Sequence, residues 1–315
     1  MRVVFMGTPE FALPSLTALL EAGYPVVGVF TQPDRPQGRG GKIAMSPVRQ
    51  LCAEKGLAVF QPERIKSPEG AQMLEDLRPD LCVTAAFGQI LSPRNLAAPK
   101  MGTVNVHASL LPRHRGSAPI NRAIEMGDAV TGVTTMLTDA GLDTGAMLLQ
   151  RETPIGDAET AGELSERLSR IGAELLIETI RGLENGTVRP VPQDESRMTY
   201  EPMLRREDGK MDFRLPARVL ERKIRAFTPW PGAWAELPNG RLKIHQARVR
   251  EDCGAGRPGE ILVSSAKEGL VVACAEGALE ILEMQAPNAK RMTAKAYLMG
   301  KPLPAGTVLN GEEAQ

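Results

Sequence analysis

Short apolar runs alternate with helical patterns over the first part of the chain, up to about residue 186. The runs that are typical of strands are 3–6, 26–31, 81–86, 103–107 and 132–137. The run 81–86 is apolar on both alternating faces, as expected for a central parallel strand that helices cover on each side. The pattern therefore predicts a doubly wound α/β sheet.

A different pattern follows this sheet. Apolar side chains recur at a helical period from 160 to 183, which predicts a long helix that closes the first domain. Segment 187–205 has no periodicity and contains three prolines, as an extended tether would. A helical pattern at 215–227 then precedes five short β-type runs, which predict a small barrel. The runs are 233–237, 242–249, 260–263, 270–274 and 279–285. We therefore expect a first domain at 1–189, a linker at 190–205 and a second domain at 206–315.

The composition fits two folded domains. The chain has 315 residues, 42% of them apolar, and its 38 Lys and Arg balance 38 Asp and Glu, which excludes a disordered chain and a uniformly basic nucleic-acid coat. The amino terminus goes from a short apolar run straight into a turn, and no apolar stretch approaches the roughly 18 residues of a membrane span. We therefore expect a cytoplasmic protein with no membrane partner. Four scattered cysteines lack metal-ligand spacing, which predicts reduced thiols and no metal site: Cys52, Cys82, Cys253 and Cys274.

Positive charge is concentrated in one window of this neutral chain. Residues 205–250 hold 12 Lys or Arg against 5 Asp or Glu, and Arg222 and Arg225 lie on the predicted helix. A polyanion can dock on such a window. A solvated helix face with ordinary strand charges explains the same residues equally well.

A Gly-rich loop at 34–42 carries a second group of basic residues, namely Arg35, Arg39 and Lys42. The loop leaves the carboxyl end of the second predicted strand, which is the edge where open α/β sheets bind ligands. It lacks the glycine spacing and the following Ser or Thr of a phosphate-binding P-loop. The first turn keeps only Gly7 of a dinucleotide fingerprint, so we do not expect NAD binding.

The most informative chemistry lies in the predicted strand 103–107. Asn105 and His107 are two residues apart, so in a strand their side chains share a face and can act on one reacting group. An imidazole for proton transfer beside an amide donor for a developing oxyanion is a plausible acyl-transfer pair, and Asp143 in a Gly-flanked turn can orient or stabilise the imidazole. Taken alone, such a pair also fits side chains that satisfy buried backbone groups.

The segment around these residues resembles the signature of the folate-dependent formyltransferases. The match reads Asn105-Val-His107-Ala-Ser109-Leu-Leu-Pro112, then Arg115-Gly116, followed by Asp143. Three further stretches, at 6–11, 31–36 and 227–232, extend the resemblance over essentially the whole chain. The resemblance implies a Rossmann-like amino-terminal domain that carries catalysis and a C-terminal barrel related to the OB fold that helps to hold tRNA.

The resemblance also implies a reaction and its site. The formyl group of 10-formyltetrahydrofolate passes to the α-amino group of initiator methionyl-tRNA, without a metal, and we expect a monomeric enzyme. Asn105, His107 and Asp143 are then the catalytic residues, and the loop at 34–42 reaches the acceptor stem with Arg39 as its key contact. The folate site is implied at Ser109, Leu110, Leu111, Pro112, Phe87, Gly88, Ile90 and Leu91. Met203 departs from the family, whose members often have a lysine near this position, and Arg205 or Arg206 can substitute for it.

Two other functions stay open. The catalytic strand does not identify the acceptor, so a small amine such as a nucleotide-linked amino sugar or glycinamide ribonucleotide is one alternative; the basic window and the loop at 34–42 favour tRNA. A non-catalytic RNA-binding module that uses the barrel is the other. The intact set of Asn105, His107 and Asp143 opposes the second alternative, and a measurement of folate binding separates it from an enzyme.

Overall fold

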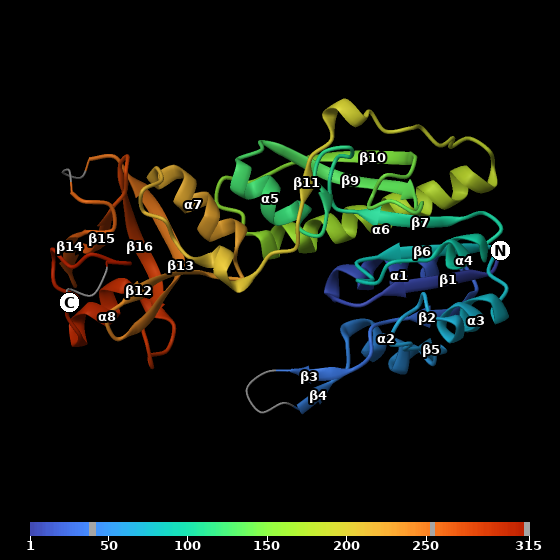
Figure 1. Ribbon diagram of the computed structural model, residues 1–315, viewed down its shortest axis with the longest axis horizontal. Coiled ribbons are helices and arrows are strands. Elements are labelled where there is room, and N and C mark those ends of the chain that lie inside the picture. Colours follow the sequence, from blue (N-terminus) through green and yellow to red (C-terminus); the bar gives the residue numbers. More distant parts are fainter. Residues whose placement is uncertain (38–41, 253–255, 312–315) are drawn as a thin grey trace. The chain divides into compact units, whose positions relative to one another are not determined.

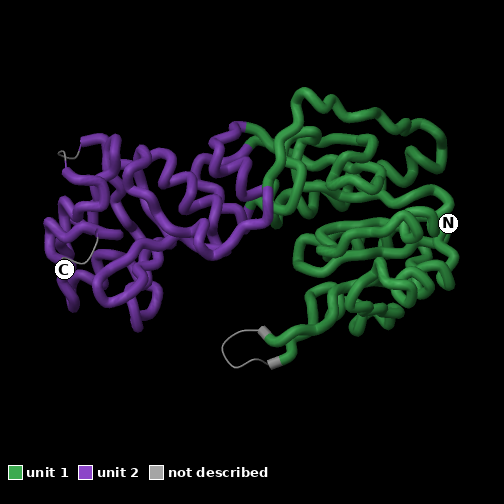
Figure 2. Tube along the Cα trace, in the orientation of Figure 1, with its two compact units in different colours: residues 1–119, 130–154, 164–201 green, residues 120–129, 155–163, 202–315 purple. Residues whose placement is uncertain are grey.

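The computed structural model describes residues 1–37, 42–252 and 256–311. Its internal contacts divide the chain into two compact units, shown in different colours in Figure 2. Unit 1 comprises residues 1–119, 130–154 and 164–201, and unit 2 comprises residues 120–129, 155–163 and 202–315. The chain thus enters unit 2 twice before its second half begins. The domain limits at 189 and 206 stay a prediction.

Unit 1 is built on a seven-stranded sheet (Figure 1). Its order is β10 (Met147–Pro154), β9 (Val130–Leu137), β7 (Thr103–His107), β6 (Leu81–Ala85), β1 (Val3–Gly7), β2 (Val26–Phe30) and β5 (Val59–Phe60). Neighbouring strands from β7 to β5 run parallel, whereas β9 and β10 are antiparallel additions at one edge. The five expected strands are confirmed, while β5 and β10 were not expected.

Helices cover both faces of this sheet, as the doubly wound prediction requires. They are α1 (Leu13–Glu21), α2 (Pro47–Lys55), α3 (Pro68–Asp76), α4 (Pro93–Ala97) and α6 (Ala161–Glu184). Gly172 of α6 lies close to Val106 and Val133 on one face. On the other face Met6 and Cys82 share a core cluster with Leu74 of α3. Helices α2, α3 and α4 each begin with a Ser N-cap followed by Pro, a combination that satisfies and preorganises the first turn.

The segment expected as a tether is attached to unit 1. Val191 pairs with Met147, and β11 (Tyr200–Glu201) forms a parallel pair with β8 (Arg115–Gly116). A short 3-10 turn, Glu195–Arg197, lies between these two attachments. We call residues 191–201 the strap. The strap is extended, as expected, but it is paired with the part of unit 1 that follows β7.

Unit 2 contains an antiparallel sheet of six strands. Its main order is β12 (Ala233–Leu237), β13 (Gly240–Arg250), β16 (Ala278–Gln285), β15 (Gly269–Ala273) and β14 (Ile261–Ser265), with β17 (Met292–Thr293) on β16. Helix α7 (Ala217–Ala226) contributes Leu220 and Ile224 to the core of the sheet, and α8 (Ala294–Gly300) contributes Ala294. The expected helix and all five expected strands are confirmed, with limits that shift by up to two residues.

The two outer strands of this sheet are bridged by the segment 306–310. The backbone N–H of Ile261 in β14 donates to Thr307, and the N–H of Asn310 donates to Glu236 in β12. The Asn310 side chain adds bonds to the Glu236 N–H and the Met211 carbonyl. The sheet is therefore closed by a bridging segment, since no direct pairing joins β12 to β14 within the described ranges.

The two parts of unit 2 that precede residue 164 dock on α7 and the turn after it. Asn121, in α5 (Pro119–Met126), donates to the Ala226 carbonyl. The Gly162 N–H donates to the carbonyl of Thr228. None of the helices in the ranges described has the length and apolar character that a membrane crossing needs.

Candidate active site

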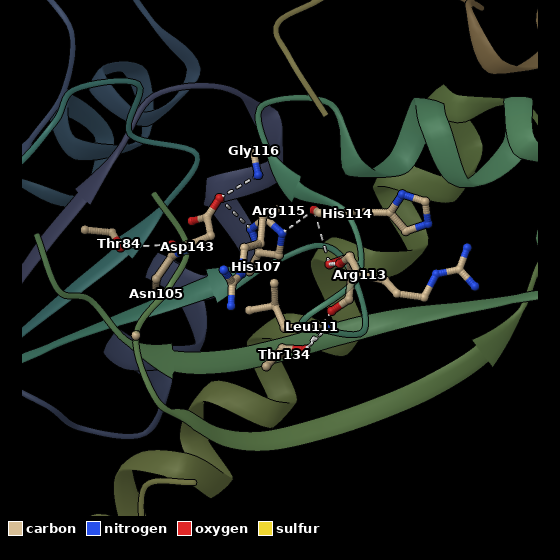
Figure 3. Close-up of polar contacts among 12 residues, drawn as sticks. Thr84, Asn105, His107, Leu111, Arg113, His114, Arg115, Gly116, Thr134 and Asp143 are labelled. Carbon is tan, nitrogen blue, oxygen red and sulfur yellow. Dashed lines mark hydrogen bonds and ion pairs between the residues drawn. The ribbon is translucent and has the colours of Figure 1, made fainter. Parts of the chain in front are cut away.

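Strand β7 places Asn105 and His107 on the face of the sheet that carries Met6, because Met6 pairs with Thr84 and Thr84 pairs with Asn105 in register. Figure 3 shows the two side chains beside Asp143. Asn105 is half-buried and His107 is only 6% exposed. The expectation that the two side chains share a face is confirmed.

The Asn105 amide is oriented by Thr84 on the neighbouring strand. The Thr84 hydroxyl donates to Asn105 Oδ1 at 2.9 Å (Figure 3). An amide oxygen held in this way leaves the Nδ2 hydrogens as the donors that the side chain can offer to a ligand. Asn105 is therefore preorganised as a hydrogen-bond donor.

The His107 ring is held by its Nε2 atom. Nε2 lies 2.9 Å from the His114 carbonyl oxygen, which can only accept, so Nε2 carries a hydrogen. In the neutral ring Nδ1 is then the basic nitrogen. Nδ1 lies 3.8 Å from Asp143 Oδ2, so a proton taken up at this atom faces a carboxylate.

Asp143 is fixed by the backbone on both sides. Its own φ is 53°, a left-handed conformation, and its Oδ2 accepts the Gly116 N–H at 2.8 Å (Figure 3). Asp139 closes the turn before it, because its Oδ1 accepts from the Gly141 N–H and the Thr144 hydroxyl. The carboxylate of Asp143 therefore keeps its direction toward the His107 ring.

The turn 109–114 is braced from within unit 1. The Ser109 hydroxyl donates to the carbonyl of Arg113 at 2.7 Å. Thr134 accepts the Leu111 N–H and donates to the Ser109 carbonyl, while Gln150 donates to the Leu111 carbonyl. Ser109, Leu111 and Pro112 are buried and Leu110 is half-buried, so in this structure these predicted folate-site side chains support the turn.

The predicted folate stretch at 86–91 combines core anchors with exposed backbone. Phe87 and Leu91 belong to the core cluster that also contains Met6 and Cys82, whereas Ile90 is 70% exposed. Ala86 and Gly88 have φ values of 46° and 77°, which turn the chain sharply at the carboxyl end of β6. The Gln32 side chain donates to the carbonyls of Phe87 and Gly88 and ties this turn to the end of β2.

The predicted tRNA contacts of the Gly-rich loop are only partly described. Arg35 lies in β3 (Arg35–Gln37), where it forms an exposed pair with Glu63 at 3.5 Å. Arg39 and the side chain of Lys42 lie outside the described part of the chain, although the backbone of Lys42 is in β4 (Lys42–Ala44). The two short strands pair with each other in antiparallel direction.

Arg222 and Arg225 are engaged inside unit 2. Arg222 donates to the Glu125 carbonyl, and Arg225 pairs with Glu221 at 2.7 Å and donates to the Glu159 carbonyl. The Arg225 side chain is 14% exposed. Burial also lowers the pKa of the neighbouring Lys223. The structure thus uses this face of α7 for packing.

Three cations of β13 are exposed, namely Arg241, Lys243 and Arg248. Arg241 stacks over the Trp234 ring at 3.9 Å, and Lys243 is exposed. Arg248 and Arg250, further along the strand, both bind the buried carboxylate of Glu280. The charge window at 205–250 is therefore partly neutralised by acidic residues that lie outside it.

Several residues that hold the site were not found by sequence reasoning. Thr84 orients Asn105, Thr134 braces the turn 109–114, and Gln193 and Glu201 of the strap contact residues beside His107 and Asp143. For Thr84 and Thr134 the only local sign was that they lie beside apolar residues in predicted strands, whereas Gln193 and Glu201 lie in the segment that was expected to be an extended tether. Their partners are distant in sequence, so no spacing pattern reveals them.

In the described ranges, no group of residues is arranged for metal binding or for thiol chemistry. No cluster of three or more His, Cys, Asp or Glu is arranged to hold a metal ion there. Cys52, Cys82 and Cys274 are buried free thiols, and burial raises the pKa of Cys82 to about 12. Cys253 lies outside the described residues.

Comparison with known proteins identifies the family of this chain. Residues 1–180 match the model of the formyl transferase family, and residues 203–302 match the formyl transferase C-terminal domain. A methionyl-tRNA formyltransferase of Trichlorobacter lovleyi is 48% identical over 99% of this chain and 98% of its own. That of Symbiobacterium thermophilum is 48% identical over 100% of this chain and 97% of its own. The chain belongs to the methionyl-tRNA formyltransferase family.

Solved structures share the fold at low sequence identity. A Helicobacter canadensis N-formyltransferase in complex with folinic acid and dTDP-3-aminofucose is 19% identical, with a TM-score of 0.66, and the match covers 92% of this chain and 99% of that one. Aquifex aeolicus HypX in complex with tetrahydrofolic acid is 19% identical, with a TM-score of 0.64, over 95% of this chain and 47% of that one. This chain and these two proteins therefore share one fold.

Proposed function

We propose that this protein transfers the formyl group of 10-formyltetrahydrofolate to the α-amino group of initiator methionyl-tRNA, and that Asn105, His107 and Asp143 carry the reaction. The observation that supports this most is the convergence at the end of β7: an oriented amide donor, an imidazole with a basic Nδ1, and a carboxylate 3.8 Å from that nitrogen. Family membership supports the tRNA acceptor and the formyl donor.

The proposed chemistry is an addition followed by an elimination. The α-amine nitrogen attacks the formyl carbon, a C–N bond forms, and the carbonyl electron pair moves to oxygen. Asn105 Nδ2 donates to that oxyanion, where a preorganised donor contributes about 10²–10³-fold. The bond from the formyl carbon to N10 then breaks.

Proton transfer is assigned to His107 Nδ1. The attacking amine loses a proton to this atom, and the same proton passes to N10 as it leaves. Asp143 stabilises the intermediate imidazolium. A free α-amine titrates at about 7.7–8.0, so part of it is neutral at pH 7 and strong base catalysis is unnecessary.

The folate contacts are proposed for the backbone of the turn 86–91 and for the turn 109–112. Ile90 offers an exposed apolar side chain to a flat ring, and the positive φ of Gly88 turns the chain sharply beside it. The side chains of Phe87, Leu91, Ser109, Leu111 and Pro112 act by holding these two turns, since they are buried.

For tRNA, we propose Arg35, Arg39 and Lys42 as contacts to the acceptor end, with Arg39 as the main one. Of the basic residues in unit 2, Arg241 and Lys243 are better placed for phosphate contacts than Arg222 and Arg225, whose donors are used within the unit.

The test is a comparison of acceptors. Transfer from 10-formyltetrahydrofolate is measured to methionyl-tRNA, to free methionine and to a nucleotide-linked amino sugar. We expect methionyl-tRNA to be strongly preferred; equal or faster transfer to the amino sugar contradicts the proposed acceptor. Asn105→Ala and His107→Ala should each lower kcat about 10²-fold or more, with folate affinity nearly intact. A near-normal kcat in either variant removes that residue from the mechanism.

A further inference from the structure

The strap, residues 191–201, pairs with two segments of unit 1, one next to the turn that contains Asp143 and one next to the residue that accepts the hydrogen bond of His107. At one end Val191 pairs with Met147, just after the turn of Asp143. At the other end β11 pairs with β8. This strand directly follows His114, whose carbonyl accepts the hydrogen bond from His107 Nε2. A segment that only connected two domains would not need either pairing.

Arg115 anchors the middle of the strap. It is 3% exposed, and its guanidinium donates twice to Gln193 Oε1, at 2.7 and 2.9 Å, and twice to the Glu195 carboxylate, at 2.7 and 2.9 Å. A buried guanidinium is costly unless its donors are matched, and here the strap supplies the partners. Arg115 is therefore turned to the strap.

Gln193 connects Arg115 to the turn that contains Asp143. With its oxygen held by Arg115, its Nε2 atom donates to the carbonyls of Asp143 and Gly145, both at 2.8 Å. The amide has two hydrogens and the turn offers two carbonyls, so both donors are used. Asp143 itself has a left-handed backbone, which a short polar side chain tolerates but which needs surrounding contacts to persist.

The far end of the strap acts on His107 through His114. The Thr199 hydroxyl accepts the His114 N–H at 2.8 Å, and Glu201 Oε1 lies 3.0 Å from His114 Nδ1. His114 and Glu201 are each 3% exposed, and His114 also has a positive φ, of 57°. The carbonyl of this residue is the acceptor that holds His107 Nε2.

We propose that the strap is a positioning element of the catalytic site and that Gln193 is the positioning residue for Asp143. Gln193 touches neither substrate in this proposal. It sets the direction of the Asp143 carboxylate toward His107 Nδ1 by holding the backbone of the turn, while the Gly116 N–H holds the carboxylate itself. This inference rests on the proposed role of Asp143.

The direct test replaces Gln193 in the full-length protein. Gln193→Met keeps the length of the side chain and removes both donors. Gln193→Glu keeps an acceptor for Arg115 and also removes the donors. We expect single-turnover formyl transfer to methionyl-tRNA to fall about 10-fold or more in each variant, because small misplacements in an active site are costly. The KM values for folate and tRNA should stay within about twofold.

A double-mutant cycle with Asp143→Ala separates positioning from general support of the fold. If Gln193 acts through Asp143, Gln193→Met has no further effect on the transfer rate once the carboxylate is absent. Ser196→Ala is the matched control, since Ser196 lies on the strap but bonds to Asp194, and its rate should equal that of the unchanged protein.

Each outcome has a defined meaning. A normal transfer rate in Gln193→Met or Gln193→Glu overturns the proposal, and so does an equal fractional loss in the presence and absence of the Asp143 carboxylate. Loss of the fold in both variants also overturns it, because Gln193 would then be needed for folding and not for positioning. A normal rate in Asp143→Ala alone instead refutes the proposed catalytic role on which the inference depends.

Discussion

Thr84→Val should slow formyl transfer and change the free energy of unfolding only slightly. The change keeps the shape of the buried side chain on β6 and removes the hydroxyl that donates to Asn105 Oδ1 at 2.9 Å. Without this bond the amide can rotate, and its donors no longer point in one direction. The Asn105 amide then has to be ordered again each time the transition state forms, which raises the activation free energy.

The size of the effect follows from one hydrogen bond. A typical intramolecular hydrogen bond contributes about 0.5–1.5 kcal/mol, which corresponds to about 2- to 13-fold in rate. This is well below the loss expected when the donor itself is removed in Asn105→Ala. The free energy of unfolding should change by about 1 kcal/mol or less, because half-buried Asn105 can bond to water instead.

Thr84→Ser gives the opposite combination. It keeps the hydroxyl and loses a buried methyl group, so it should lower stability by about 1 kcal/mol and leave the rate near normal. The rates come from single-turnover transfer to methionyl-tRNA and the stabilities from urea unfolding. Thr131→Val, on a buried threonine of β9, is the control for the substitution itself.

The reasoning is refuted if the valine variant transfers at the normal rate. It is also refuted if the serine variant is as slow as the valine variant, because the loss would then follow packing and not the hydroxyl. A rate loss in Thr131→Val of the same size would assign the effect to the sheet in general.

Three further predictions concern the strap, its charge and unit 2. Gly116→Ala should lower the thermal midpoint far more than Gly186→Ala, because both have positive φ but only at Gly116 would a Cβ meet a backbone oxygen, that of Glu201, at 2.4 Å. The hydrogen bond from Arg115 lowers the pKa of Glu195, so this pair contributes stability above the ordinary glutamate range and loses it as pH falls through the lowered pKa; the protection factors of the strap amides, which correct exchange for its intrinsic pH dependence, should fall there in the unchanged protein and change less with pH in Glu195→Gln. Replacing Arg241 and Lys243 by Gln should reduce the slope of log K against log salt for tRNA binding by about 1.4–1.8, whereas Lys267→Gln should not, and an unchanged slope would show that neither cation contacts phosphate.

Much of the fold could be predicted because it depends on local periodicity. The run 103–107 became β7 with the same limits, and the alternation of Asn105 and His107 with valines fixed which side chains share a face. The apolar run at 81–86 was correctly expected at the centre of the sheet. In unit 2 the turns between apolar runs separated the strands, so their order along the chain was clear.

The rest depended on contacts between distant residues. Strand β11 has two residues, and it forms because Arg115 and Gly116 offer backbone partners more than eighty positions earlier. The charge pattern could not show that Arg222 and Arg225 donate to the carbonyls of Glu125 and Glu159, which lie 97 and 66 positions earlier. No periodic pattern records such partners.

The bridging segment 306–310 also protects two sheet edges in unit 2. It occupies backbone groups of β12 and β14 that would otherwise be open. An open edge is a template for strands of another chain and a common start of aggregation. A cut, frameshift or poorly chosen fusion that removes this segment would therefore leave every residue of the proposed catalytic site in place and still yield an aggregating protein.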